Sequence, residues 1–305
     1  MFRNLKCIKN KVNQECNKRE AKEIIYEISK NKNKLNIINI SQNNLKRCLE
    51  SEDIDKILKF NIEKIDEYNI DYDYSELKRN SLCKFNPDVC SINIKLESDK
   101  LEKLNKEVKE KISVYNNDLL VLEKLKKHYK KNNNVSKDIY IKFARDKNND
   151  LIGLYFDIEK FVKDKMSNIY LFSKNTDYLY PSVLFLQYRN YIEHSVPIKN
   201  SYRREFDYGY ALICDFLVKD KRIGHGTFML SNLETILHKV NKRISYRNRN
   251  IDNDGRTINE IVAVNGMLGP GEDTTYEDLV KFYNKNGYPT YSNGYIEDRN
   301  IYKEI

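Results

Sequence analysis

Residues 208–227 read YGYALICDFLVKDKRIGHGT, an apolar, β-prone run that passes through a glycine turn into a helical pattern. Glycines at 224 and 226 would let the backbone of this turn approach a ligand closely. The first amides of a helix point outward at the positive end of its dipole, which suits a negatively charged group. The segment therefore predicts a strand, a turn and a helix that together form an anion site.

The spacing of these glycines excludes two widespread phosphate sites. The pattern Gly-x-Gly-x-x-Gly of dinucleotide-binding folds is absent, and no Gly-Lys-Ser/Thr follows the turn as a P-loop requires. An ordinary tight turn before a helix stays open as the alternative interpretation.

The chain beyond this turn continues the alternation of helix and strand. Apolar residues at helical spacing predict a helix from His225 to about Val240, and residues 258–264 predict a second strand. A further helix is expected over about 274–286, ended by Gly287 as its C′ residue. Residues 288–302 then predict a hairpin that turns at 292–294.

Upstream, the clearest hairpin pattern joins residues 138–145 to residues 151–158 through the polar turn 146–150. Between this hairpin and residue 208 the chain is rich in aromatic residues. A break at Tyr180–Pro181 predicts a helix that contains the apolar residues Leu184, Leu186, Tyr188 and Ile192.

The N-terminal third predicts helices with one strand. Residues 1–34 are expected to form a polar extension with one amphipathic stretch, and residues 35–40 alternate as a strand does. Ser51 is expected to cap a helix whose apolar face ends with Ile62 and Ile65. Residues 99–131 predict one long helix or two.

Composition indicates a globular protein. The 305 residues are 40% apolar with 23 Tyr and 12 Phe, which excludes wholesale disorder although 32% are charged. This length suits one large domain or two ordinary ones. The net charge of +9 is spread without a block of five like charges, so it indicates a solvated surface and does not favour nucleic acid as the partner.

Cysteine usage predicts a reducing compartment. The six cysteines, at positions 7, 16, 48, 83, 90 and 214, include no CxxC pair, and the four histidines are scattered. This pattern predicts neither a zinc site nor a disulfide framework.

No run approaches the ~18–20 apolar residues that span a bilayer, and residues 1–33 lack the apolar core of a signal peptide. We therefore expect a cytoplasmic protein with no membrane partner.

Two motifs resemble the GNAT superfamily of acyl-CoA-dependent N-acetyltransferases. The glycine turn is similar to the family's acyl-CoA-binding motif, [Gln/Arg]-x-x-Gly-x-[Gly/Ala], with Lys221 first and Gly224 and Gly226 in register. Residues 282–288, FYNKNGY, resemble the family's helix end Phe-Tyr-x-x-x-Gly-Phe, with Tyr283 in place of its tyrosine.

The chain departs from the family pattern at three points. Lys221 stands where Gln or Arg is usual, and Tyr276 and Leu279 stand where Asn and Ala commonly precede the tyrosine. The loop after the strand at 258–264 is also long.

The resemblance implies an α/β (α+β) fold with a GNAT-like mixed, mostly antiparallel sheet flanked by helices. It implies that residues 35–305 form the acyltransferase domain after the extension 1–34. Residues 66–135 would then be an enlarged helical region, and residues 159–207 an insertion between the third and fourth strands of the family.

The resemblance also implies acetyl-CoA as the acyl donor, with its pyrophosphate at the glycine turn. The residues implied to contact this cofactor are Phe216, Leu217, Val218, Lys221, Arg222, Ile223, Gly224, His225, Gly226, Thr227 and Tyr283. His225 is expected to line the cofactor and not to ionise in catalysis.

The implied mechanism is direct transfer to an amine. A backbone N–H of the strand 208–218 would polarise the thioester carbonyl, and Tyr283 would protonate the departing thiolate. Because an ammonium group must lose a proton before it attacks, a carboxylate or a water relay is expected nearby. Asp215 and Glu260 are the candidate bases, with a polar residue on an open sheet face and an edge-strand charge as the respective alternatives.

The sequence leaves the acceptor open between small-molecule and protein amines, and it leaves a homodimer open. Two rival functions also stay open. One is a GNAT-like domain that binds coenzyme A without turnover, and the other is a basic helical protein that binds nucleic acid.

Overall fold

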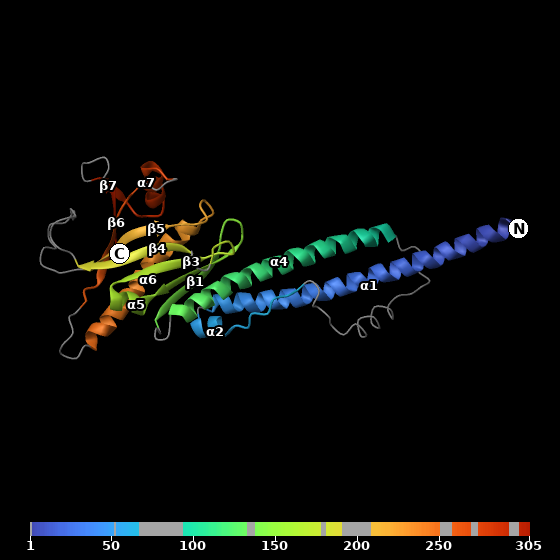
Figure 1. Cartoon of the computed structure of the whole chain (residues 1–305), viewed down its shortest axis with the longest axis horizontal. Helices are drawn as coiled ribbons and strands as arrows, with labels where there is room; N and C mark the ends of the chain where they lie inside the picture. Colours follow the sequence, from blue (N-terminus) through green and yellow to red (C-terminus); the bar gives the residue numbers. More distant parts are fainter. Residues whose placement is uncertain are drawn as a thin grey trace. The chain divides into compact units, whose positions relative to one another are not determined.

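The computed structural model describes residues 2–51, 53–66, 94–132, 138–177, 181–190, 209–250, 258–269, 274–292 and 299–305 (Figure 1). The chain divides into two compact units. The first combines Met1–Ser51 with Lys59–Leu119, and the second combines Glu52–Leu58 with Leu120–Ile305. This division differs from the predicted boundary at residue 34, because one helix runs through that position without a break.

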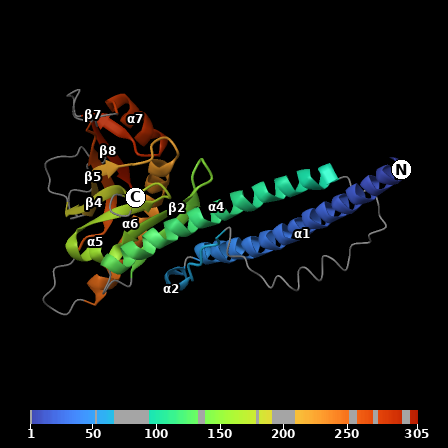
Figure 2. The same cartoon turned by 45° about the vertical axis from the view of Figure 1, so that its right-hand side comes forward.

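Two long helices that run in the same direction build the first unit. α1 (Phe2–Glu50) lies beside α4 (Ile94–Asn132), as both Figure 1 and Figure 2 show. The Asn31 amide donates to Asn105 Oδ1 at 2.8 Å, and Lys111 Nζ donates to Asn39 Oδ1 at 2.9 Å, so later residues of α1 meet later residues of α4. The buried α4 residues Val108, Ile112, Tyr115 and Leu119 follow the four-and-three spacing of a coiled-coil seam.

This seam corrects the predicted strand at 35–40, which is helical. Ile38 is fully buried against Val108 and Ile112, and Leu45, one heptad further on, is buried as well. Alternation over six residues fits a helix seam as well as a strand, and a helix that continues on both sides decides the outcome. Residues 2–34 of the predicted polar extension 1–34 are accordingly part of α1.

The predicted helix after Ser51 is much shorter than expected. α2 (Ile54–Lys59) spans six residues, and Asp53 caps it by accepting hydrogen bonds from the amides of Asp55 and Lys56 at 3.0 and 3.2 Å. Ser51 instead donates to the Cys48 carbonyl at 2.8 Å, at the end of α1. Ile65 lies beyond α2 and is held by the Asn116 side chain, which bonds both its amide and its carbonyl. The predicted Ser51 cap is therefore wrong.

The second unit is built on one mixed sheet of eight strands in the order β1-β2-β3-β4-β5-β6-β8-β7. Neighbouring strands are antiparallel except for β5 and β6, which are parallel. This arrangement confirms the predicted mixed, mostly antiparallel sheet of an α/β protein. The strands are β1 Ile139–Arg145, β2 Leu151–Asp157, β3 Met166–Phe172, β4 Ser182–Asn190, β5 Gly209–Leu217, β6 Ile261–Met267, β7 Thr290–Ser292 and β8 Arg299–Glu304.

Helices cover this sheet on both faces. α6 (His225–Arg249) makes the crossover that parallel strands require, and its apolar side forms a core with α5 (Ile158–Asp164). Ile152 and Leu154 of β2 belong to that core, whereas Tyr155 packs against His128 in the last turns of α4. Because successive strand residues face opposite sides, the last turns of α4, which belong to the second unit, cover the face opposite to α6.

The range 159–207 was expected to be an insertion, and its described residues supply β3 and β4 of the central sheet. The predicted helix through Leu184, Leu186 and Tyr188 is strand β4, and all three side chains are buried. Their spacing of two residues is that of a strand face, and a central sheet position accommodates it. Ile192 lies outside the described residues.

The C-terminal predictions are largely confirmed. α7 (Tyr276–Lys285) starts at the Thr275 cap, and Gly287 follows it with φ of 78°. The Tyr288 amide donates to the Tyr283 carbonyl at 2.9 Å, which is the 6→1 bond of a Schellman motif. β7 and β8 form the expected hairpin, whose turn lies outside the described residues. β6 begins three residues later than predicted, at Ile261.

No described helix carries a stretch long and apolar enough to cross a membrane.

Candidate functional site

The carboxyl end of β5 leaves its parallel neighbour before the strand ends. β5 pairs with β6 as far as Ile213, which lies opposite Gly266. From there β5 continues to Leu217, and among the described strands it pairs only with β4. Cys214 forms a bulge at this point. Leu186 of β4 pairs with Ile213, and the next β4 residue, Phe185, pairs with Asp215, so the register passes over Cys214. The backbone groups of residues 214–217 that point away from β4 therefore have no strand partner among the described residues.

Apolar side chains are exposed where the two strands end. Leu217 of β5 is 46% exposed and Met267 of β6 is 71% exposed. A strand end that combines backbone donors and acceptors without a strand partner with exposed apolar side chains suits an extended amphipathic chain.

The turn between β5 and α6 opens at the same end of the sheet. Arg222 and Gly224 both have positive φ, of 68° and 99°, and the Gly224 carbonyl accepts the first helical hydrogen bond from Phe228 at 2.9 Å. The amides of residues 225–227 make no hydrogen bond within the described part of the chain. They are the donors that an anion at a helix N-terminus would occupy.

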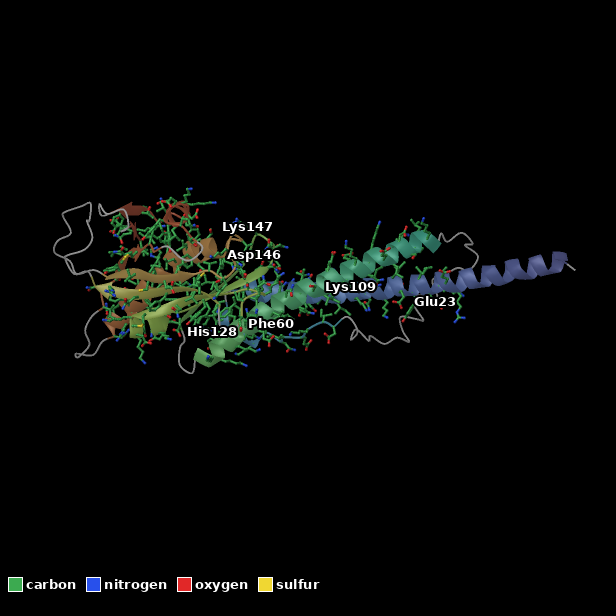
Figure 3. All side chains as sticks on the ribbon, turned by 45° about the horizontal axis from the view of Figure 1, so that its top comes forward. Glu23, Phe60, Lys109, His128, Asp146 and Lys147 are labelled. Carbon is green, nitrogen blue, oxygen red and sulfur yellow. The ribbon has the colours of Figure 1, made fainter. Side chains whose placement is uncertain are left out.

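The side chains around this turn are exposed, and most of them are basic. Lys221, Arg222 and Thr227 are all exposed. The β1–β2 turn adds Lys147, whose ammonium donates to the Arg222 carbonyl and whose amide donates to the Ile223 carbonyl, both at 3.1 Å. Figure 3 shows Asp146 and Lys147 on the β1–β2 turn.

Gly226 has a different role from the one that the sequence suggested. A Cβ atom at this position would lie 3.0 Å from Phe282 Cζ and 3.3 Å from Val218 Cγ2. The missing side chain thus lets α7 pack closely against the start of α6. Gly224, by contrast, would have its nearest neighbour at 3.9 Å, so space at the turn lies beside Gly224.

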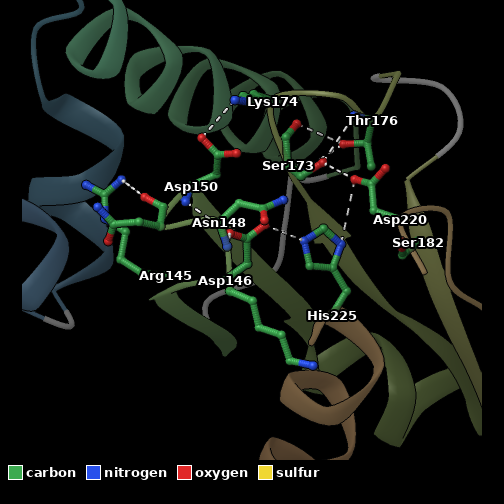
Figure 4. Close-up of polar contacts among 12 residues, drawn as sticks. Arg145, Asp146, Asn148, Asp150, Ser173, Lys174, Thr176, Ser182, Asp220 and His225 are labelled. Carbon is green, nitrogen blue, oxygen red and sulfur yellow. Dashed lines mark hydrogen bonds and ion pairs between the residues drawn. The ribbon is translucent and has the colours of Figure 1, made fainter. Parts of the chain in front are cut away.

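The side chain of His225 does not line the turn, contrary to expectation. Its ring is fully buried between two carboxylates (Figure 4), with Nε2 3.3 Å from Asp146 Oδ2 and Nδ1 3.7 Å from Asp220 Oδ2. Only its backbone amide can face a ligand at the turn. Nδ1 is the one buried side-chain nitrogen or oxygen among the described residues that has no hydrogen-bond partner.

Tyr283 is placed by α7 beside the free end of β5. Its ring centroid lies 6.3 Å from that of Phe216 and 5.3 Å from that of Phe282. Burial, and then the nearby Asp215 carboxylate, raises the pKa of Tyr283 far above its usual value. The phenol is therefore neutral at physiological pH and can act as a hydrogen-bond donor.

Asp215 lies on the opposite face of the sheet from Tyr283. Phe216 pairs with Leu184, and both contact the core beneath α6, whereas Asp215 pairs with Phe185 on the other face. The Asp215 side chain is exposed. The free end of β5 thus separates a phenol on one face from a carboxylate on the other.

Glu260 is not part of this arrangement. It precedes β6 at the amino end of the parallel pair, where its carbonyl accepts from the Gly209 amide at 3.0 Å and its carboxylate accepts from Ser245 at 2.5 Å. Asp215 is six residues along β5 from Gly209, which corresponds to about 20 Å. The prediction that Glu260 lies where the two strands separate is wrong, because these strands separate at their carboxyl ends.

Two residues near the turn were not anticipated: Asp146 and Asp220. The motif 146–150 indicated only a polar hairpin turn, and its contact with His225 joins residues 79 positions apart. No local pattern signals such a contact.

The described residues contain no group of three or more His, Cys, Asp or Glu side chains that could hold a metal ion. No family model, no curated protein and no solved structure matches the chain.

Proposed function

We propose that the chain is an N-acyltransferase of the GNAT type that transfers an acetyl group from acetyl-CoA to an amine. The observation that carries this proposal is the early end of the β5–β6 pairing at Ile213, at the same end of the sheet as the N-terminus of α6. An elongated ligand with a phosphate-rich end needs both features together.

The residues around the turn suit the pyrophosphate of coenzyme A. The amides of residues 225–227 would donate to it, and Lys221 and Arg222 would supply positive charge. The backbone groups of residues 214–217 that point away from β4 would hydrogen-bond the pantetheine amides and polarise the thioester carbonyl. Leu217, Met267 and Phe216 would contact its apolar parts.

The two faces of the sheet divide the chemistry. A neutral amine that approaches from the Asp215 face attacks the thioester carbon, and the C–S bond breaks to give an amide and the coenzyme A thiolate. The proton that the nitrogen loses on forming the amide passes through water to the thiolate, which leaves as the thiol. Asp215, directly or through water, takes the proton that the ammonium group loses. Because the pKa of Tyr283 lies above that of a thiol, its hydroxyl stabilises the leaving thiolate as a hydrogen-bond donor and not by full proton transfer.

Calorimetric titration with acetyl-CoA tests the donor site. Arg222→Glu reverses an exposed charge beside the turn and should weaken binding about tenfold. Lys242→Glu is the matched control, since Lys242 is exposed on the same helix 17 residues beyond its start, or about 25 Å away. No binding by the wild-type chain, or equal losses in the two variants, would remove acetyl-CoA from this turn.

Release of thiol from acetyl-CoA in the presence of a panel of small amines and peptides tests turnover. Retention of coenzyme A without thiol release would favour the binding domain over the enzyme. Tight binding of RNA or DNA with a steep dependence on salt, combined with no affinity for acetyl-CoA, would favour the nucleic-acid protein.

A further inference from the structure

One face of β4 carries polar side chains that lie close to Asp215. Alternate residues of β4 are buried in the core beneath α6. Phe185, Gln187 and Arg189 lie between them, on the opposite face of the sheet. Phe185 pairs directly with Asp215, so Gln187 is a diagonal neighbour of Asp215, a relation that places two residues about 7–8 Å apart.

Arg189 is held by this glutamine. Its Nε and Nη2 donate to Gln187 Oε1 at 3.1 and 2.9 Å. The side chain is exposed, and its other N–H groups make no hydrogen bond or ion pair within the described part of the chain. A guanidinium has five N–H donors in one plane, so Nη1 and the remaining N–H of Nη2 can bind a carboxylate in two places.

The Asp215 carboxylate places the opposite charge close to this guanidinium. It is exposed, and no ion pair joins it to Arg189 or to another described residue. Cys214 lies between the two charges, since it precedes Asp215 and its Sγ is 3.8 Å from Gln187 Oε1. Burial raises the pKa of Cys214, Arg189 lowers it and Asp215 raises it, so both charges act on this thiol. The exposed surface at Cys214 is therefore flanked by two opposite charges that do not neutralise each other.

Glu304 is the other charged residue on this face of β4, β5, β6 and β8. Tyr210 and Ala263 lie between it and Arg189 in a row of directly paired residues. The row spans three strand spacings, or about 14 Å. Because charges on a surface are largely screened beyond about 10 Å, Glu304 does not neutralise Arg189.

We propose that the acceptor is an α-amino acid, whose carboxylate binds Arg189 and whose amino group lies toward Asp215. The assignment rests on the proposed function for the acetyl donor and for the base. Charge-assisted hydrogen bonds are about 2.8 Å long, and the amino nitrogen and carboxylate of an amino acid are about 3 Å apart. A zwitterion of this size bridges the distance that the strand register sets between the two charges. An acceptor with a second positive charge would be repelled by the guanidinium.

The product of this transfer is an N-acetyl amino acid. Asp215, directly or through water, takes one proton from the ammonium group, and the neutral nitrogen attacks the thioester carbon. The C–S bond breaks, and the proton that the nitrogen loses on forming the amide passes through water to the thiolate. Arg189 moves no proton. It determines specificity, so its removal should raise KM for the amino acid more than it lowers kcat.

Thiol release from acetyl-CoA tests the assignment with L-amino acids that carry small, aromatic, acidic and basic side chains, each compared with its carboxamide. The carboxamide keeps the amine but lacks the negative charge that favours its protonated form. Intrinsic reactivity therefore favours the carboxamide, and a preference for the amino acid must come from the protein. We expect kcat/KM for the best amino acid to exceed that for its carboxamide at least about tenfold, the effect of losing hydrogen bonds to a charged group.

Arg189→Gln removes the guanidinium from an exposed position, so the fold should be preserved. It should lower kcat/KM for the amino acid at least about tenfold and leave the carboxamide unchanged. Arg249→Gln is the matched control, because Arg249 is exposed at the end of α6, 24 residues or about 36 Å beyond the start of that helix. Equal use of amino acids and carboxamides by wild type, or equal losses for both in Arg189→Gln, would overturn the assignment.

Failure of the proposed function gives a different result. A wild-type chain that binds acetyl-CoA but acetylates no amino acid overturns the assignment and leaves the donor site in place. If the chain binds no acetyl-CoA, the proposed function fails, and saturation-transfer NMR of the amino acids and carboxamides without the donor decides the assignment. Amino-acid binding that is lost in Arg189→Gln and kept in Arg249→Gln would support it. No binding, or binding that Arg189→Gln leaves intact, would overturn it.

Discussion

Acidification should destabilise the second unit through His128, in the last turns of α4. The ring is 8% exposed and packs between the aromatic rings of Tyr155, Tyr170 and Phe172, with centroid distances of 5.0, 4.3 and 5.3 Å. Burial, aided by Lys131 and Lys160, lowers the pKa of His128 from 6.5 to about 4. The folded protein therefore resists a proton that the unfolded chain accepts.

The sign and size of the effect follow from these two pKa values. Stability from neutral His128 is fully present above pH 6.5 and is lost as the pH falls toward 4. The difference between the two pKa values corresponds to a loss of about 3 kcal/mol of unfolding free energy once His128 is protonated in both the folded and the unfolded protein. At pH 5 the loss is about 2 kcal/mol.

Urea unfolding at pH 7.5 and pH 5.0 tests this prediction. His128→Leu removes the titrating ring. Between the two pH values, the unfolding free energy of the variant should therefore fall by about 2 kcal/mol less than that of wild type. His238→Leu is the matched control, because His238 is exposed on α6 and should leave the pH dependence unchanged. If His128→Leu keeps the wild-type dependence, burial of a neutral histidine does not explain acid sensitivity.

Other predictions address the site and the elements around it. Tyr283→Phe should leave acetyl-CoA affinity unchanged and lower kcat roughly 10- to 100-fold, because the variant loses one hydrogen bond to a charged group. An unchanged kcat would mean that Tyr283 only packs in the core. Asp157→Ala removes the α5 cap, which accepts from Lys160 N at 2.8 Å, and should cost about 1 kcal/mol of unfolding free energy in urea titration. Gly287→Ala forces a side chain into φ of 78° and should lower the melting temperature by several degrees, with Gly269→Ala, where a Cβ would meet no atom within 4 Å, as the control.

Local sequence patterns were enough to predict the elements in which periodicity, turn residues and capping residues all indicate the same structure. The β1–β2 hairpin carries two alternating runs around a polar turn, and α7 carries both a cap and a terminating glycine. The strand, turn and helix predicted over residues 208–240 rest on the same kind of agreement, and the helix in fact continues to Arg249. In each case the signal lies in neighbouring residues of the chain, so no distant contact is needed to decide it.

The secondary structure of short apolar runs was decided by the elements that they pack against. Residues 35–40 and the pair Leu184 and Leu186 each fit two periods, and the outcome depended on α4 in one case and on the flanking strands in the other. A six-residue window cannot separate periods of 2 and 3.6 when both place apolar residues on one side.

The candidate site shows the same division. The sequence by itself determined that a glycine turn starts α6 and that Tyr283 lies near the end of α7, because both statements concern neighbours along the chain. Only the tertiary structure decided that Asp215 and Tyr283 lie on opposite faces, that Glu260 lies at the far end of the parallel pair, and that His225 is buried between two carboxylates. Those properties depend on strand register and on contacts between residues distant in sequence, which local periodicity does not encode.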